Sequence, residues 1–314
     1  MTGRVLHTGQ AIVDVVMRVA SVPAPGSDIF ASDSSLLVGG GFNVMAAARR
    51  EGAPVVYAGG HGTGPLGDLV RAALRAEGVE VLLAAQPGLD TGFCVALTDD
   101  DAERTFVSTV GAEGHVPDDA LDDVVVTADD VVYVSGYSLH HPANASMLAR
   151  ALPRLGAAAG EVVVDASPII GDVPDAALQT LLDAATIWTV NEREARVLAE
   201  RVLGPLPDPV PAEELAGRLA ERLGTVVLVR VGPAGCWVAR PGEPPTLVPG
   251  IAVTAVDTNG AGDAHTGVLC AGLCAGTSLE EAVTRANVAA GIAVTRPGPA
   301  TSPTAAEITA QLAR

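Results

Sequence analysis

The sequence contains no lysine, because all 19 basic residues among its 314 positions are arginine. Walker A loops and protein kinases place a lysine on nucleotide phosphates, and Schiff-base chemistry needs a lysine amine. The absence excludes these chemistries. The 37 acidic residues outnumber the arginines and give a net charge of −18, which disfavours nucleic acid and anionic membranes as partners. We therefore expect a small soluble molecule as the partner.

Aromatic residues and cysteine motifs are also scarce. Aromatics make up 3% of a chain that is 48% apolar, so Ala, Val and Leu must form the core, as in buried parallel strands covered by helices. The four cysteines form no CxxC pair and no HExxH occurs, which favours reduced core thiols over a zinc site. No secretion signal or long apolar run is visible, so we expect a cytoplasmic protein.

Strand and helix patterns alternate along most of the chain. Short runs rich in Val or Ile predict strands, and the segments of Ala, Leu, Arg and Glu between them have helical spacing. The strands are expected at residues 55–58, 79–84, 130–134, 161–165, 186–190 and 225–231, and helices at 66–77, 143–155, 192–203 and 212–223. This order predicts an α/β fold with a doubly wound, mostly parallel sheet flanked by helices.

Two regions interrupt this alternation. Residues 13–37 contain strand-like pieces around a proline-rich turn, and residues 91–110 read as a hairpin around an acidic turn at 98–102. Neither region has a helix to cover it. We expect the two segments to form a small antiparallel β lid that stands off the main sheet, inserted in a single domain spanning residues 1–314.

The motif with the clearest chemistry is Asp-Thr-Asn-Gly-Ala-Gly-Asp at residues 257–263, followed by a predicted helix at 264–276. Small residues at a helix start leave backbone N–H groups free to bind developing negative charge. Asp263 would lie beside this anion pocket and could accept a proton from an attacking hydroxyl. Taken alone, a short glycine pattern also fits a plain helix cap with a tight turn.

This motif resembles the C-terminal signature of the ribokinase-like (PfkB) carbohydrate kinases, and Gly-Gly-Gly-Phe-Asn at residues 39–43 is similar to their N-terminal signature. The resemblance covers nearly the whole chain. It implies ATP-dependent phosphorylation of a hydroxymethyl group of a monosaccharide, such as ribose, fructose or a related sugar. Asp263 would be the general base, and the amides of Gly260, Ala261 and Gly262 would form the anion hole. The family uses no Walker A lysine.

Further positions of this sequence match the family's nucleotide site. Residues 191–194 resemble its NxxE motif, in which the glutamate organises water around Mg²⁺ and the asparagine lies near the phosphates. Without the resemblance, Asn191 is a good helix cap, and Arg230 fits a solvent-facing residue as well as a phosphate contact. The positions that the resemblance places on ATP and Mg²⁺ are Asn191, Glu194, Arg230, Gly232, Gly235 and Asn287.

Residues 293–298, continued to Ser302, are similar to the loop that holds a monovalent cation in ribokinases. Bound K⁺ would act through its charge on the anion hole rather than in the chemistry itself. The ligands that the resemblance implies for K⁺ are Asp257, Asn259, Ala293, Arg296, Gly298 and Ser302.

For the sugar, the resemblance implies a pocket lined by Asp14, Gly40, Gly41 and Asn43. Glycines let the backbone approach a polyol, and asparagine offers both a donor and an acceptor. From the sequence alone, Asp14 fits a turn at a strand end equally well.

Several positions depart from the ribokinase pattern and leave the substrate open. Gly40 replaces a lysine, Ile12 replaces an asparagine, and the acidic sugar contact has no match near residues 135–137. A sugar phosphate would need basic residues, and Arg104 on the predicted lid is the one placed to contact it. His265 replaces a phenylalanine, and it either reaches the substrate or caps a helix turn.

Other functions fit parts of the sequence. Residues 62–67 match the GxGxxG pattern of dinucleotide binding, but the following strand carries its acidic residue at the wrong end. A nucleoside kinase of the same family is an alternative, as is a sugar or nucleoside binder without activity, although binding alone does not require Asp263. Lid sheets of this family often pair between subunits, which makes a homodimer an expectation.

Overall fold

The computed structural model describes residues 3–101 and 103–314, so Ala102 of the predicted lid turn lies outside them. A sheet in the order β13-β12-β11-β10-β9-β8-β1-β4-β5 forms the centre. Its strands are β1 (Val5–His7), β4 (Val55–Tyr57), β5 (Glu80–Val81), β8 (Val131–Ser135), β9 (Glu161–Asp165), β10 (Ile187–Asn191), β11 (Val226–Arg230), β12 (Gly235–Ala239) and β13 (Thr246–Pro249). The pairings from β5 to β11 are parallel, and β12 and β13 join antiparallel.

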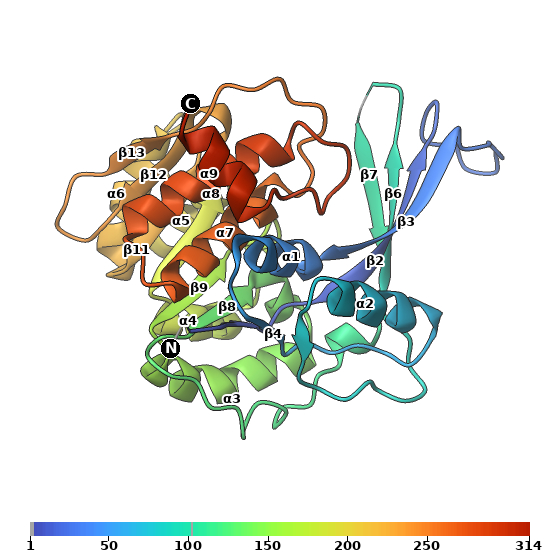
Figure 1. Ribbon diagram of the computed structural model, residues 1–314, viewed down its shortest axis with the longest axis horizontal. Helices are drawn as coiled ribbons and strands as arrows, with labels where there is room; N and C mark the ends of the chain where they lie inside the picture. Colours follow the sequence, from blue (N-terminus) through green and yellow to red (C-terminus); the bar gives the residue numbers. More distant parts are fainter. Residues whose placement is uncertain (1–2, 102) are drawn as a thin grey trace.

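Helices cover both faces of this sheet (Figure 1). One face carries α3 (Pro142–Ala158), α4 (Asp175–Ala184), α5 (Glu192–Leu203) and α6 (Ala212–Leu223). The other carries α1 (Gly41–Glu51), α2 (Pro65–Ala76), α7 (Ala261–Cys274), α8 (Leu279–Ala293) and α9 (Ala305–Leu312). The predicted doubly wound, mostly parallel sheet flanked by helices is therefore confirmed.

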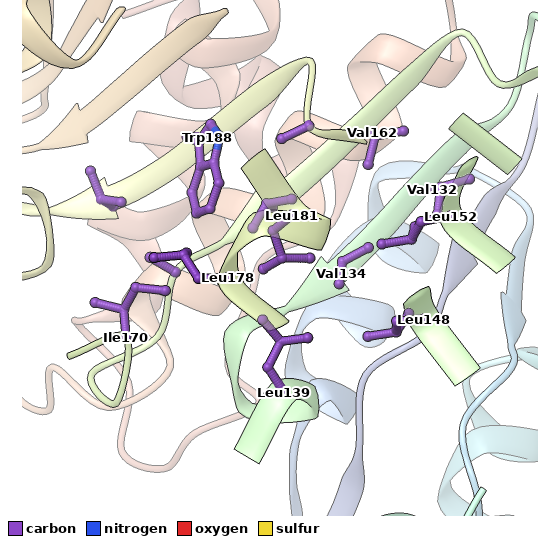
Figure 2. Close-up of a cluster of buried hydrophobic side chains, with 14 of the residues drawn as sticks. Val132, Val134, Leu139, Leu148, Leu152, Val162, Ile170, Leu178, Leu181 and Trp188 are labelled. Atoms are coloured by element: carbon purple, nitrogen blue, oxygen red, sulfur yellow. The ribbon is translucent and has the colours of Figure 1, made fainter. Parts of the chain in front are cut away.

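Alternation along each strand divides the core into two clusters. On β8, Val132 and Val134 pack toward α3 and α4, whereas Val131 and Tyr133 pack toward the opposite helices. Figure 2 shows the first cluster, in which Trp188 of β10 lies beside aliphatic side chains. Each fully buried Val or Leu contributes about 1.5–3 kcal/mol. Both faces being buried explains why the strand sequences are continuously apolar.

A second sheet, in the order β3-β2-β6-β7, forms the lid and stands to one side of the body (Figure 1). Its strands are β2 (Ala11–Arg18), β3 (Asp33–Gly40), β6 (Phe93–Thr98) and β7 (Arg104–Ser108). The β2–β3 and β6–β7 pairs are antiparallel as expected, but β2 and β6 pair in parallel. Both strands leave the body in the same direction, so the expectation of a wholly antiparallel lid is wrong in its central pair.

One predicted strand is too long. Of residues 79–84, only Glu80–Val81 form a strand, β5, which pairs with β4 at the edge of the sheet. An edge strand has a partner on one side only, and the chain turns away to form a bridge between Gly62 and Gln86. The other predicted strands and helices lie within a few residues of the observed ones.

Two further findings concern the described residues. Cys94, Cys236, Cys270 and Cys274 are free and buried. No helix in the described part of the chain is long and apolar enough to cross a membrane.

Candidate active site

The predicted motifs converge at one edge of the central sheet. Parallel strands end at the same edge, and β9, β10 and β11 end there in Asp165, Asn191 and Arg230. Helix α7 begins beside these strand ends, as shown by the contacts of the Arg230 side chain with its first two turns. In open α/β sheets, ligands bind at this carboxyl edge. The geometry therefore brings together groups far apart in the sequence.

Asp263 lies in the first turn of α7, next to Asn43 of α1. The Asn43 Nδ2 group donates a hydrogen bond of 2.8 Å to Asp263 Oδ2. A carboxylate accepts only from the amino end of an amide, which fixes the orientation of the Asn43 side chain. Its buried Oδ1 has no partner among the described residues, so it is free to accept a hydrogen bond from a hydroxyl.

The environment of Asp263 suits a base that works near neutral pH. Burial raises its pKa from 3.8 to about 6, and the nearby charges of Asp165 and Asp14 also raise it. The hydrogen bond from Asn43 and the charge of Arg230 act in the opposite direction. A carboxyl group with this pKa is ionised above pH 6 and still accepts a proton readily.

The turn before α7 has the form of an anion hole. Gly260 adopts φ 74°, and a Cβ there would lie 1.9 Å from the Pro299 oxygen, so only glycine fits. The amides of Gly262 and Asp263 donate to no acceptor within the described residues, as expected for the first turn of a helix. The Ala261 amide, which the resemblance also implied for the anion hole, instead donates to Thr258 O at 3.4 Å. The two free N–H groups and the positive end of the helix dipole lie at the helix start that carries the Asp263 carboxyl group.

The predicted sugar loop lies on the lid side of Asp263. A Cβ on Gly39 would lie 2.0 Å from Asp14 Oδ2, so the Asp14 side chain rests directly on this glycine backbone. Burial raises the pKa of Asp14 to about 6. Gly40 ends β3 with φ 61°, and the Gly41 amide donates to Gln10 O at 2.6 Å as α1 begins.

The Asn191–Glu194 segment forms a reciprocal cap at the start of α5. Asn191 Oδ1 accepts from the Glu194 amide at 2.9 Å, and Glu194 Oε2 accepts from the Asn191 amide at 2.8 Å. The helix-cap interpretation of Asn191 is therefore correct, whatever its role toward phosphate. Burial and the charge of Asp165 raise the pKa of Glu194, although Arg230 opposes them.

Arg230 is not a solvent-facing residue, which removes one of the two interpretations of this position. Its side chain is 13% exposed and pairs with Asp165 and Glu194. Burial acts to lower the pKa of Arg230, but these two carboxylates outweigh burial and raise it. The guanidinium is therefore charged near neutral pH.

The remaining positions on the predicted ATP side have structural partners. Gly232 and Gly235 flank a turn with φ 57° and 113°. Asn287 of α8 donates through Nδ2 to Val248 O and Pro249 O at 2.9 and 3.2 Å, which ties α8 to the end of β13. His265 is 2% exposed, and burial lowers its pKa to about 3. Neither ring nitrogen has a hydrogen-bond partner among the described residues.

The predicted cation loop packs against the start of the motif at residues 257–263. Asp257 accepts from the amides of Asn259 at 2.9 Å and Gly298 at 3.0 Å. The oxygen of Ala293 accepts from the Arg296 amide and the Thr301 hydroxyl, each at 3.1 Å. The loop is therefore held close to Asp257, as the resemblance implied.

Two observations test whether this loop and Glu194 suit metal ions. The Ser302 hydroxyl is buried at 4% exposure and has no partner among the described residues, which fits an oxygen ligand for a cation. Glu194 uses Oε2 for its protein partners, which leaves Oε1 for a metal-bound water. No cluster of three or more His, Cys, Asp or Glu side chains in the described part of the chain could hold a metal directly.

The sequence did not indicate the contacts that three residues make near this site. Arg104 of β7 donates to Asp257 Oδ1 at 2.5 Å and joins the lid to the motif at residues 257–263. Glu113 accepts from the amides of Gly92 and Gly111, each at 2.8 Å, at the two ends of the β6–β7 hairpin. Asp165 was signalled only as the acidic end of an apolar run.

Known proteins are similar to this chain along nearly its whole length. The family model described as "pfkB family carbohydrate kinase" matches residues 3–306. The chain is 31% identical to "Uncharacterized sugar kinase YegV" of Escherichia coli K12, over 97% of this chain and 92% of that protein. It is 26% identical to a ribokinase of Haemophilus influenzae over 92% of each. Among solved structures, adenosine kinase from Sinorhizobium meliloti superposes with a TM-score of 0.83 at 24% identity, covering 99% of this chain and 100% of that one.

Proposed function

The chain belongs to the pfkB family of carbohydrate kinases, and we propose that it transfers the γ-phosphoryl group of ATP to a hydroxymethyl group of a monosaccharide such as ribose or fructose. The observation that carries the proposal is the placement of Asp263 beside Asn43, at the start of a helix with free amides. We take residues 1–314 as one catalytic unit, in a cytoplasmic setting where ATP is available.

In this mechanism the ionised Asp263 accepts the proton of the sugar hydroxyl while the hydroxyl oxygen forms a bond to the γ-phosphorus of ATP. The bond between that phosphorus and the β–γ bridging oxygen breaks, and ADP leaves with the electron pair. The amides of Gly262 and Asp263 bind the negative charge that develops on the transferred group. Asn43 Oδ1, left without a partner, and Asp14 orient the hydroxyls of the sugar.

Two ions belong to the proposal. Bound Mg²⁺, with a water held by Glu194, would supply positive charge to the ATP phosphates. K⁺, held by the Asp257 carboxyl group, the Ser302 hydroxyl and carbonyls of residues 293–298, would add positive charge near the anion hole. Both assignments rest on the oxygen atoms left open at Glu194 and Ser302.

The lid would exclude water, which otherwise competes with the sugar as acceptor. Its contact from Arg104 to Asp257 favours a closed position over the site. Leu36, Phe106 and Val107 are exposed on the lid strands. These side chains lie on β3 and β7, the two edge strands of the lid. Exposed apolar side chains on edge strands favour pairing with a second copy, so a homodimer through the lid is part of the proposal, testable by light scattering.

The central test is a coupled ADP-release assay with ribose, fructose, other ketoses and nucleosides. We expect ATP-dependent turnover with at least one sugar, and loss of more than about 10³-fold in Asp263→Asn. Undiminished turnover in that variant would contradict the mechanism. Preferred turnover of a nucleoside would favour the nucleoside kinase, the alternative consistent with the adenosine kinase neighbour. Sugar binding without turnover would favour a non-catalytic binder.

A further inference from the structure

Arg230 joins four elements of the site through one guanidinium group. From β11, its Nη1 lies 3.1 Å from Asp165 Oδ2 on β9 and 3.0 Å from Thr266 Oγ1 on α7. Its Nη2 lies 3.3 Å from Glu194 Oε2 on α5. Thr266 also donates to Asp165 at 3.2 Å. The helix that carries Asp263 is thereby tied to the strand and helix that carry the other two carboxylates.

This cluster is buried and has unequal charges. The side chains of Arg230, Asp165 and Glu194 are 13%, 13% and 5% exposed. One positive and two negative groups leave a formal charge of −1, and desolvation makes such a cluster a poor source of stability compared with apolar residues. Its presence at the site therefore favours a role in the reaction over one in folding.

The guanidinium also lies directly behind the anion-hole turn. A Cβ built on Gly262 would meet Arg230 Nη1 at 3.4 Å and Cζ at 3.5 Å, and Nη1 is 3.5 Å from the Gly262 oxygen. Because Gly262 has no side chain, the Arg230 guanidinium packs directly against the backbone of the turn that carries the free amides. In a site with low solvent access, such a fixed charge acts strongly on a developing anion.

We propose that Arg230 is a positioning residue for phosphoryl transfer, which fixes the first turn of α7 against Asp165 and Glu194 and keeps a permanent positive charge behind the anion hole. This inference rests on the proposed kinase function and deepens it. Arg230 touches no reacting atom, so it acts through Gly262, Asp263 and Glu194. It meets, with arginine, a need for positive charge in a chain that has no lysine.

The charge of Arg230 also acts on Asp263, and the groups around that base come from several elements. They are Asn43 on α1, Asp14 on β2, Asp165 on β9 and Arg230 on β11, together with the phenols of Tyr133 within β8 and Tyr137 just after it. Among these, Arg230 alone carries positive charge. Its removal should make the base harder to ionise, and removal of Asp165 should make it easier.

The test uses the purified full chain, ATP and the best acceptor found for the wild type. Arg230→Gln removes the charge, and Arg230→Gln with Asp165→Asn removes it while the formal charge of the cluster stays at −1. The double variant keeps the test valid if the single variant fails to fold, because it leaves one carboxylate in excess, as in the wild type, whereas the single variant leaves two. Arg230→Lys keeps the charge but reaches fewer partners. Arg150→Gln removes an exposed arginine paired with Asp122 and is the matched control.

We expect kcat to fall about 10²-fold in Arg230→Gln and in the double variant, with KM for the sugar within about threefold. Arg230→Lys should lose about tenfold. The acidic limb of the kcat/KM profile should move to higher pH in Arg230→Gln, to lower pH in Asp165→Asn, and little in the double variant. Arg150→Gln should match the wild type.

Three results would overturn the inference. One is recovery of wild-type kcat in the folded double variant, which would mean that Arg230 only balances Asp165. The second is a lowered melting temperature in Arg230→Gln without any change in kcat or in the pH profile. The third is wild-type activity in Arg230→Lys and Arg230→Gln alike. A wild type without turnover on any acceptor would instead overturn the proposed kinase function itself.

Discussion

The side-chain amide of Asn43 donates a 2.8 Å hydrogen bond to Asp263 Oδ2 across 220 positions of sequence. Helices α1 and α7 pack closely enough for this contact because Gly267 leaves no Cβ, which would lie 2.4 Å from Val44 O. The N-terminal and C-terminal motifs thus meet in one bond. That bond lowers the pKa of a carboxyl group that burial raises to about 6.

Asn43→Leu should therefore shift the pH dependence of the reaction. Without the donor, the pKa of Asp263 rises above about 6, so the acidic limb of the kcat/KM profile moves up by about 0.5–1 pH unit. The loss of Oδ1 as a sugar contact should also raise KM about tenfold. Initial rates between pH 5 and 9 measure both effects, and an unmoved acidic limb would contradict the assigned contact.

Asp263→Asn should stabilise the fold near neutral pH while it abolishes turnover. The folded state raises the pKa of Asp263 from 3.8 to about 6, so the ionised carboxyl group destabilises the fold. The protonated carboxyl group makes its full favourable contribution to the fold below about pH 4, and this contribution is lost as the pH rises through 6. The loss amounts to about 3 kcal/mol by pH 7.5.

Urea unfolding at pH 7.5 and at pH 4.5 checks this sign. The variant should be more stable at pH 7.5, and the gain should shrink at pH 4.5. Asp122→Asn is a suitable control, because its hydrogen bond to Arg150 lowers the pKa of Asp122 and gives no gain on neutralisation. Equal stability of Asp263→Asn and the wild type at pH 7.5 would contradict the raised pKa.

Arg104→Ala should weaken lid closure without affecting the chemistry. Burial acts to raise the pKa of Asp257, but the amides of Asn259 and Gly298 together with Arg104 hold it below its usual value. The pair is partly exposed, so its loss should cost about 0.5–1 kcal/mol. KM for the sugar should rise about two- to fivefold with kcat within twofold. Arg240→Ala, which removes the pair with Glu280, should change neither.

Glu113→Gln should loosen the hinge of the lid. Glu113 accepts from Gly92 and Gly111 at 2.8 Å, and the amide that replaces it offers one acceptor instead of two. The free energy of unfolding should fall by about 2 kcal/mol. Hydrogen exchange should accelerate in β6 and β7 more than in the central sheet. A uniform acceleration across the chain would show that Glu113 supports the whole fold instead.

K⁺ should bind at the loop that contains Ser302. The buried Ser302 hydroxyl without a partner predicts that KCl raises both the melting temperature and kcat relative to choline chloride. Ser302→Ala should raise the K⁺ concentration that gives the half-maximal effect about tenfold. A melting temperature that is indifferent to K⁺ in the wild type would remove the site.

Much of the site was predictable because its residues lie at strand ends and helix starts. Asp263, Asn191 and Glu194 each follow a recognisable run of residues, and a parallel sheet gathers such positions at one edge. The short edge strand β5 and the parallel pairing of β2 with β6 depend on neighbours that local patterns do not specify.

Contacts between residues distant in the chain could not be predicted either, because local sequence patterns do not specify them. Arg230 reads locally as the polar end of a strand, and only the packing of β9, α5 and α7 around it identifies its partners. Glu113 lies in a short 3-10 turn with no motif, although it holds both ends of the lid hairpin. Such roles arise from contacts between segments distant in the chain.

The junction of β3 and α1 links the lid mechanically to the reacting end of the site. Strand β3 ends at Gly40 and helix α1 starts at Gly41, with no residue between them. The lid strand therefore continues directly into the helix that carries Asn43, and the chain changes direction at Gly40, with φ 61°. A substitution of Gly40 would therefore act on proton transfer through Asn43 as well as on the sugar pocket that Gly40 is expected to line.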